Sequence, residues 1–192
     1  MKEKRESTGA KESGPRLLVT PLGVVDEIAV SVAAANIQAA FDLQVDVEAQ
    51  QRCPDSAILQ ARPQYDAARI MAFLEHGLSP GTFRLGLTGE DISLAFLTYV
   101  YGEARIGGKA GVVSTCRLEK AGKDGFAAKS TMYERVAKVT VHETGHLLGL
   151  MHCSRPDCVM NFSVGLDRLD RLTQTFCTGC RSFLHKQCGL PG

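Results

Sequence analysis

The sequence predicts an α/β fold in which a twisted, mainly parallel sheet ends in an antiparallel edge strand. Segments with the two-residue apolar period of strands alternate with segments that have the apolar spacing of helices. Two of the later strand segments are separated by a stretch with two adjacent glycines, which favours an antiparallel pair. With 192 residues, 44% of them hydrophobic, the chain is long enough for one core and short for two.

The first three elements are expected to be a strand, a helix and a strand. Residues 16–20 are mostly apolar, and Pro21 is expected to end that strand. Residues 24–41 are rich in alanine and have helical apolar spacing. The stripe predicted to face the core comprises Val25, Ile28, Val32 and Ala35. Residues 42–49 alternate apolar and polar side chains, as a half-buried strand does.

A second helix is expected over residues 65–76, with Ile70, Phe73 and Leu74 facing the core. Three segments then predict strands, and these are 83–88, 98–106 and 112–118. The longest helix is predicted over residues 131–148. Beyond it, only 166–176 and 182–187 have a noticeable periodic pattern.

A group of histidines at the end of the long helix carries the strongest chemical signal. His142 and His146 lie four residues apart, so on a helix both imidazoles can reach one zinc ion. Glu143 can lie beside that metal without binding it. Gly149 permits a left-handed turn, after which His152 supplies a third nitrogen. Three nitrogen ligands leave a fourth position for water, as in catalytic zinc sites.

A bare histidine pair at this spacing can arise by chance on any exposed helix. Here the glycine and the third histidine complete the pattern H-E-x-x-H-x-x-G-x-x-H, so five specified positions coincide. Three of the five histidines of the chain lie within this pattern. The concentration favours a zinc site over coincidence.

Five of the seven cysteines follow these histidines. Cys153 and Cys158 form one pair, Cys177 and Cys180 a second, and four thiolates suit a closed, structural zinc site. An odd cysteine count without an export signal argues against a disulfide framework. A disulfide within the cluster, or ligation by Cys188, stays an alternative. The two isolated cysteines, at positions 53 and 116, are expected to be small core residues.

The run from residue 142 to residue 180 resembles the archaemetzincin family, whose motif is H-E-x-x-H-x-x-G-x-x-H-C-x4-C-x-M with a later C-x-x-C. The specified residues are all present, namely His142, Glu143, His146, Gly149, His152, Cys153, Cys158, Met160, Cys177 and Cys180. The resemblance implies a metzincin-like zincin fold with a long active-site helix, and Met160 as the Met-turn beneath the three histidines. It also implies two zinc ions, one catalytic and one structural. The stretch between Met160 and Cys177 is one residue shorter than is usual in the family.

The same resemblance implies one metallopeptidase domain, residues 16–192, after a flexible head, residues 1–15. Its N-terminal subdomain would span 16–149 and its zinc-clamped C-terminal subdomain 150–192. The head is charged and has no secretory signal, so we expect a cytoplasmic protein. The net charge of +1 and the lack of apolar stretches of about 20 residues argue against nucleic-acid and membrane partners. We expect a monomer that acts on a peptide or protein substrate.

The reaction implied is hydrolysis of peptide bonds. Zinc would lower the pKa of a bound water to about 7, and Glu143 would act as general base and then as general acid. A substrate strand could pair with the edge of the sheet near residues 99–106. Aminopeptidase-like trimming and internal cleavage both stay open. All four tyrosines lie upstream of Met160, so no group is assigned to stabilise the oxyanion.

Two other classes of function compete with catalysis. A zinc-stabilised binding or regulatory module would keep the fold without useful turnover, although the presence of Glu143 favours an enzyme. A nucleic-acid role for the cysteine cluster would use nearby basic residues, but acidic residues interrupt them and no aromatic stacking surface accompanies them. The basic residues are Arg168, Arg171, Arg181 and Lys186, and the acidic ones are Asp167 and Asp170.

Overall fold

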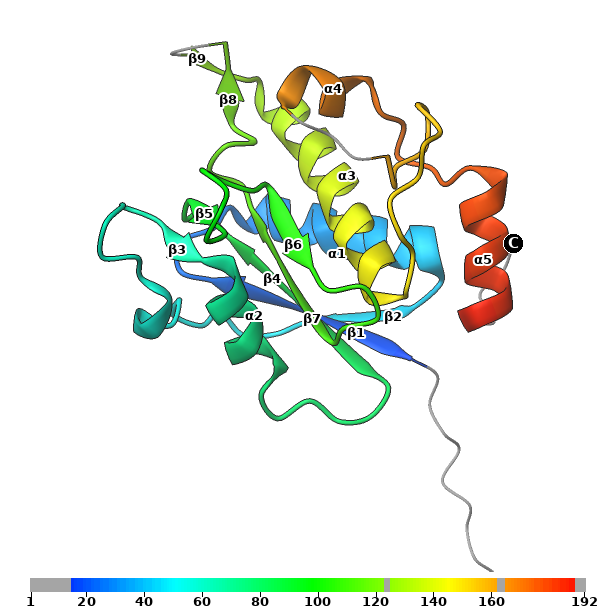
Figure 1. Ribbon diagram of the computed structural model, residues 1–192, viewed down its shortest axis with the longest axis horizontal. Coiled ribbons are helices and arrows are strands. Elements are labelled where there is room, and N and C mark those ends of the chain that lie inside the picture. Colours follow the sequence, from blue (N-terminus) through cyan, green and yellow to red (C-terminus); the bar gives the residue numbers. More distant parts are fainter. Residues whose placement is uncertain (1–14, 123–124, 162–164, 189–192) are drawn as a thin grey trace, which may run out of the picture.

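The structure is a computed structural model that describes residues 15–122, 125–161 and 165–188 (Figure 1). The predicted flexible head lies outside this part of the chain, except for its last residue. Within the described ranges, no helix is both long enough and apolar enough to cross a membrane.

A five-stranded sheet with the order β2-β1-β4-β7-β6 forms the centre of the molecule. Its strands are β1 (Arg16–Leu22), β2 (Gln44–Val47), β4 (Thr82–Thr88), β6 (Gly102–Ala104) and β7 (Ala110–Ser114). All neighbouring pairs are parallel except β6 with β7, which is antiparallel and leaves β6 at the edge. The predicted α/β fold with an antiparallel edge strand is therefore confirmed.

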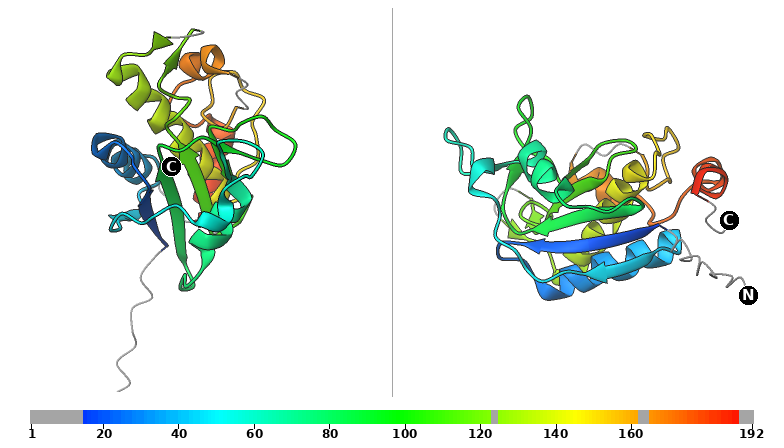
Figure 2. Two further views of the ribbon diagram at one scale, coloured as in Figure 1. Left: turned by 90° about the vertical axis from the view of Figure 1, so that its left-hand side faces the viewer. Right: turned by 90° about the horizontal axis from the view of Figure 1, so that it is seen from below.

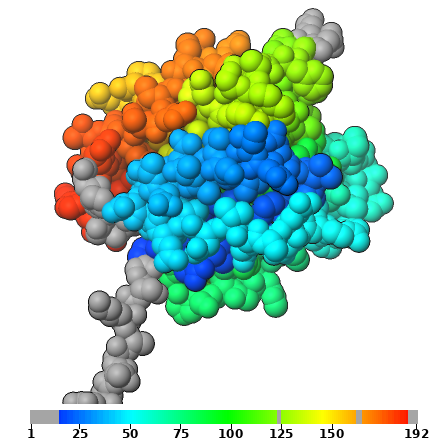
Figure 3. Space-filling model, turned by 180° about the vertical axis from the view of Figure 1, so that it is seen from behind, coloured from blue at the N-terminus to red at the C-terminus, as the bar shows by residue number. Residues whose placement is uncertain are grey.

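Two helices cover one face of this sheet and one helix covers the other. Helices α1 (Glu27–Phe41) and α3 (Lys129–Leu147) pack against each other on the first face, and α2 (Ala67–Glu75) packs on β4 and β7 from the second (Figure 2). Seen from behind, α1 forms the blue surface beside the C-terminal segments in orange and red (Figure 3). The larger apolar core lies between α1, α3 and the sheet.

The remaining elements are short. They are η1 (Asp55–Ala57), β3 (Tyr65–Asp66), β5 (Ile92–Ser93), β8 (Lys120–Ala121), β9 (Gly125–Phe126), α4 (Leu166–Arg171) and α5 (Thr178–Cys188). Strand β3 pairs with β5, and β8 pairs with β9. The sequence does not predict these two-residue ribbons, because an alternating pattern needs four or more residues to be recognised.

The starts of α1 and α3 are tied together by one aspartate. The carboxylate of Asp26 caps α1 by accepting hydrogen bonds from the backbone N–H groups of Ile28 and Ala29, at 2.9 and 3.3 Å. It also accepts hydrogen bonds from the side chains of Lys129 and Tyr133, at 3.0 and 3.2 Å. The cap therefore fixes where α3 begins relative to α1.

Three expectations about the strands and helices are wrong in detail. Strand β1 continues through Pro21. Proline has no N–H to donate, but β2 ends at Val47, so no hydrogen bond to that strand is lost at Pro21. The Pro21 carbonyl accepts a hydrogen bond from the N–H of Gln51. Strand β6 is much shorter than residues 98–106. Phe73 is 40% exposed, since the narrow buried stripe of α2 consists of Ala67, Ile70, Met71 and Leu74.

The buried face of α1 also differs from the predicted stripe. Ile28 is 58% exposed, whereas Ala29 and Ala33 are fully buried. These alanines let the helix approach α3 and the sheet closely, with Ile37 and Phe41 filling the space near its end. In a helix this rich in apolar residues, the neighbouring elements decide which side is covered.

An ion pair fastens α4 to α3. The Arg135 guanidinium donates from Nε and Nη2 to the two carboxylate oxygens of Asp170, at 2.6 and 2.7 Å. Its Nη1 donates to the carbonyls of Leu118 and Lys120. The Arg135 side chain is 5% exposed, so its charge depends on these partners. The guanidinium in turn lowers the pKa of Asp170.

We predict that Asp170→Ala lowers the free energy of unfolding by about 3 kcal/mol, because the buried charge of Arg135 loses its ion partner. Urea denaturation followed by circular dichroism measures the change. Asp167→Ala alters an exposed carboxylate of the same helix and should cost less than about 1 kcal/mol. Equal losses in the two variants would contradict the assigned role of Asp170.

The cost of Asp170→Ala should also depend on pH. The pKa of Asp170 is lower in the folded chain than in the unfolded chain, so the ion pair stabilises fully above the ordinary aspartate pKa of about 4. Its contribution is lost as the pH falls through the lower folded-state pKa. The difference between parent and variant should therefore shrink in acid.

Candidate active site

The first two histidines of the motif lie on one face of α3 with their rings oriented by backbone carbonyls. Nδ1 of His142 lies 2.8 Å from the carbonyl oxygen of Val159, and Nδ1 of His146 lies 2.7 Å from that of Leu150. A carbonyl only accepts, so each Nδ1 carries the proton and each Nε2 keeps its lone pair. The two Nε2 atoms face each other at 3.0 Å.

The third histidine reaches this pair after a tight turn. Helix α3 ends at Leu147, and Gly149 has φ = +91°, a conformation that favours glycine. The turn brings the ring of His152 to 5.3 Å from that of His142 and 4.8 Å from that of His146, measured between centroids. One ligand nitrogen from each of the three histidines lies within 4.8 Å of the others.

The three histidines form a donor set that suits zinc. Burial lowers the pKa of all three, to about 4 for His142, so the rings are neutral at neutral pH. Two Nε2 lone pairs directed at each other without protons between them would repel. A cation between them removes that repulsion, and neutral imidazole is a preferred zinc ligand.

Glu143 lies beside the histidines and is buried under the edge strand. The residue is 6% exposed, and a Cβ added at Gly102 of β6 would come within 2.8 Å of its Cγ and Oε1. Only glycine therefore fits at position 102 without moving the carboxylate. Burial, followed by the charge of Glu103, raises the pKa of Glu143 well above its usual range.

Met160 is completely buried against α3 beneath the histidines. Its sulfur occupies the space beside Gly145, where an added Cβ would lie only 2.5 Å from Sδ. Its carbonyl accepts a hydrogen bond from the N–H of Cys153 at 2.8 Å. Met160 thus packs on the helical turn between the first two histidines and also contacts the loop that follows the third.

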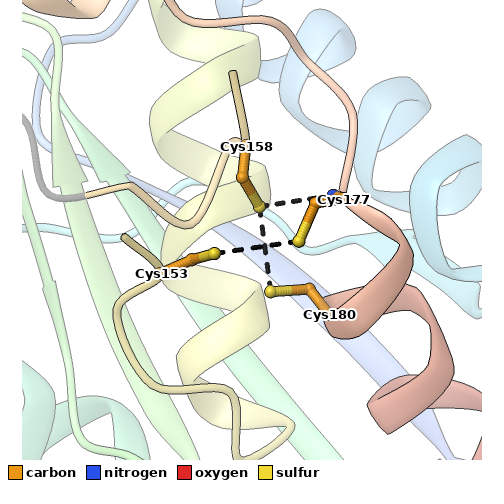
Figure 4. A group of neighbouring side chains, drawn as sticks. All are labelled: Cys153, Cys158, Cys177 and Cys180. Atoms are coloured by element: carbon orange, nitrogen blue, oxygen red, sulfur yellow. Dashed lines mark hydrogen bonds between the residues drawn. The ribbon is translucent and has the colours of Figure 1, made fainter. Parts of the chain in front are cut away.

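The four paired cysteines converge at a second cluster (Figure 4). The sulfurs of Cys153 and Cys177 lie 3.7 Å apart, as do those of Cys158 and Cys180. Disulfide sulfurs are bonded at about 2.05 Å, so these thiols are free. Four sulfurs at about 2.3 Å from a tetrahedral zinc would lie about 3.8 Å apart, close to the observed spacing.

Backbone N–H groups around the cysteine cluster stabilise negative charge on sulfur. The N–H of Arg155 lies 3.4 Å from Sγ of Cys153, and the N–H of Cys177 lies 3.4 Å from Sγ of Cys158. Hydrogen bonding by the N–H of Cys180 lowers the pKa of Cys177 to about 7. The set therefore fits a zinc ion. The alternative ligand, Cys188, has its side chain outside the described part of the chain.

The histidines and Glu143 open onto a cleft of about 600 Å³ between β6, α3 and α4. Its walls are mostly apolar, and four polar residues line it whose side chains had no individual role predicted from the sequence. These are Tyr99, Tyr101, Glu103 and Lys138. From the sequence, Lys138 could be placed near the histidines only because it lies four residues before His142 on the predicted helix.

Two tyrosines of the cleft support each other. The rings of Tyr99 and Tyr101 meet edge to face at 5.5 Å, and the guanidinium of Arg117 lies 4.1 Å above the Tyr99 ring. Burial, followed by the contact with Tyr99, raises the pKa of Tyr101. The Tyr101 hydroxyl is therefore protonated at neutral pH, on a residue that lines the cleft.

The isolated cysteines have no part in either cluster. Cys53 is buried, as expected, with its sulfur 3.5 Å from the hydroxyl of Thr88. Cys116 is only half-buried, so the expectation of a core position is wrong for this residue. It follows β7 at a turn where the side chain reaches the surface.

Comparison with known proteins places the chain in a family. The family model described as "Peptidase family M54" matches residues 41–186. An archaemetzincin of Archaeoglobus fulgidus is 36% identical over 168 residues, 87% of this chain and 97% of that protein. An archaemetzincin of Halobacterium salinarum is 34% identical over 169 residues, 86% of this chain and 97% of that one.

Solved structures agree with the sequence matches. The crystal structure of the A. fulgidus archaemetzincin complexed with malonate has a TM-score of 0.76 at 34% identity, covering 88% of this chain and 99% of that one. The archaemetzincin of Methanopyrus kandleri gives a TM-score of 0.79 at 29% identity, covering 93% and 98%. The chain therefore belongs to peptidase family M54, the archaemetzincins, and is a zinc metallopeptidase.

Proposed function

We propose that this chain hydrolyses peptide bonds at the cleft, with His142, His146 and His152 holding a catalytic zinc ion and Glu143 moving the proton. The observation that carries the proposal is the convergence of three neutral ring nitrogens beside one buried carboxylate. When bound, zinc supplies a Lewis acid and lowers the pKa of water to about 7.

The residues of the chain would each contribute a separate step. The carbonyls of Val159 and Leu150 hold two imidazoles in the tautomer that offers Nε2 to the metal. Glu143 accepts the proton of the attacking water and returns it to the leaving amine. A substrate backbone pairs with the free edge of β6. The Tyr101 hydroxyl is a candidate donor to the developing oxyanion.

Glu143→Ala is expected to lower kcat by a factor of about 10²–10⁴ while both metals stay bound, because only the proton carrier is lost. Hydrolysis of a mixed peptide pool, with metal content measured on the same samples, tests this. Glu134→Ala, an exposed site on the same helix, is the matched control. Unchanged turnover in the Glu143 variant would contradict the proton-transfer role proposed for Glu143.

A second proposal concerns the cysteine cluster. We propose that Cys153, Cys158, Cys177 and Cys180 hold a structural zinc ion, which makes two ions per chain. Four sulfurs at tetrahedral spacing support this. Residues 16–149 and 150–192 would then form two subdomains of one domain, the second clamped by this ion. Cysteines that stay reduced so that they can bind zinc would require a reducing compartment such as the cytoplasm.

Cys177→Ser should reduce the zinc content from two ions to one and lower the melting temperature more than it lowers kcat of the protein that remains folded. The reason is that structural zinc contributes directly to folding free energy. Elemental analysis and thermal unfolding give the two readouts. Cys116→Ser, which removes a thiol outside the cluster, should leave both unchanged. A Cys177 variant as stable as the parent would exclude a four-cysteine site.

The specificity we propose is aminopeptidase-like. Glu103 lines the cleft on β6, burial raises its pKa, and its charge raises that of Glu143, so two carboxylates lie near each other. The α-ammonium group of a substrate would relieve this repulsion by binding to Glu103.

Glu103→Gln is expected to lower kcat/KM for peptides with a free amino end by about tenfold, because a charge-assisted hydrogen bond is lost. Peptides with an acetylated amino end should be cleaved slowly and equally by parent and variant. Glu134→Gln controls for a change of charge on the surface. If acetylated peptides are the better substrates, the chain cuts internally and the role of Glu103 is wrong.

The rival function is a zinc-stabilised binding module. It predicts that the same peptides bind to the zinc-loaded chain and are recovered intact. Family membership and the buried Glu143 beside the histidines favour turnover.

A further inference from the structure

A buried lysine forms part of the cleft wall, one helical turn before His142. Lys138 is 6% exposed, and its Nζ donates hydrogen bonds to the carbonyls of Leu169 and Asp170, at 3.1 and 3.0 Å. Its ammonium group therefore lies at the C-terminal end of α4, which flanks α3 (Figure 1). Lysines are almost never buried to this degree unless they are paired.

The charge of Lys138 has no full counter-charge. Among the described residues, no carboxylate oxygen lies within 4.0 Å of its Nζ. Asp170, whose backbone carbonyl accepts a hydrogen bond from Lys138, gives both of its carboxylate oxygens to Arg135. The α4 carbonyls supply only partial negative charge.

The two acids that line the cleft, Glu103 and Glu143, are associated with the edge strand β6. Glu143 contacts the edge strand at Gly102, and Glu103 belongs to that strand. Residues 159–172 line the cleft with Val159, Asn161, Gly165, Leu169 and Leu172, of which only Asn161 has a polar side chain. A positive charge in an apolar wall is costly until an anion binds to it. The cleft is thus negative along β6 and positive along α4.

We propose that Lys138 selects substrates that carry a carboxylate next to the cleaved bond. The inference rests on the proposed peptidase function and names the chemistry of its substrates. Four residues of an α-helix rise about 6 Å, so Lys138 and His142 lie about one turn apart on α3, and both line the same cleft. An acidic side chain, or a free carboxyl end, on a residue next to the reacting bond is the group that the lysine would bind. Two sources of carboxylate fit this geometry, namely a glutamate side chain and the carboxyl terminus of a short peptide.

The test uses the zinc-loaded full chain and four peptides of one sequence. The residue next to the cleaved bond is glutamate or glutamine, and each peptide has a free or an amidated carboxyl end. The parent should prefer the carboxylate-bearing peptides by at least about tenfold in kcat/KM. A preference for glutamate in the amidated pair identifies the side chain as the source. A preference for the free end in the glutamine pair identifies the terminus.

The Lys138→Gln variant loses the positive charge but keeps a hydrogen-bond donor, because the glutamine amide can donate to the two α4 carbonyls. It should abolish the preference and change kcat/KM for the amidated glutamine peptide by less than about twofold. Lys129→Gln, at an exposed site of the same helix, should keep the preference. An equal loss on all four peptides in the Lys138 variant, or no preference in the parent, would overturn the inference.

A separate binding experiment distinguishes this inference from the proposed peptidase activity. Affinities of the same peptides are measured by calorimetry on the Glu143→Ala protein with Lys138 or with glutamine at that position. Tighter binding of the carboxylate peptides only when Lys138 is present supports the inference even if no peptide is hydrolysed. Absence of turnover in the parent would then count against the proposed function alone, and equal affinities would count against Lys138.

Discussion

The hydrogen bond from the His142 imidazole to the carbonyl of Val159 is the contact on which the rest of the site depends. It joins the helix that carries the first two histidines to the loop that follows the third. Val159 stands between Cys158 and Met160, so its carbonyl is positioned by a thiol on one side and by a buried thioether on the other. The tautomer of His142, which we propose as a zinc ligand, is thereby set by a segment next to the cysteine cluster.

The distribution of charge in the cleft follows from which elements form its walls. The edge strand β6 has a glycine where the Glu143 carboxylate needs room, and an acid at the next position. Helix α4, held by the Arg135–Asp170 ion pair, places its terminal carbonyls over Lys138. That ion pair fixes α4 and engages both carboxylate oxygens of Asp170, so among the described residues the lysine has only backbone carbonyls as hydrogen-bond partners.

The spacing of residues in the sequence was sufficient to predict the histidine pair, because both residues lie within one helix. A helix brings positions i and i+4 together whatever surrounds it, so His142 and His146 could be paired without knowledge of the fold. The alternation of strands and helices likewise predicted the sheet and its antiparallel edge. The buried side of α1 and the exposure of Phe73 depend on neighbours distant in sequence, which periodicity does not contain. For the same reason the tyrosines and Lys138 of the cleft were missed.

The two clusters of ligands should not be equivalent in their effect on the fold. Residues 150–165 contain no helix or strand among those described, and α4 and α5 are short, so this segment has little regular structure to keep it in place. The four thiols link its start to α5, whereas two of the three histidines belong to a long helix with many buried residues. Loss of a metal from the cysteines would therefore loosen the segment that contains His152 and Val159 and lower the stability of the fold, while protein that remains folded keeps the histidine site. Loss of a metal from the histidines would leave α3 and the cysteine clamp intact. The dependence runs in one direction because a segment with little regular structure contributes the third histidine, and the long helix α3 contributes the other two.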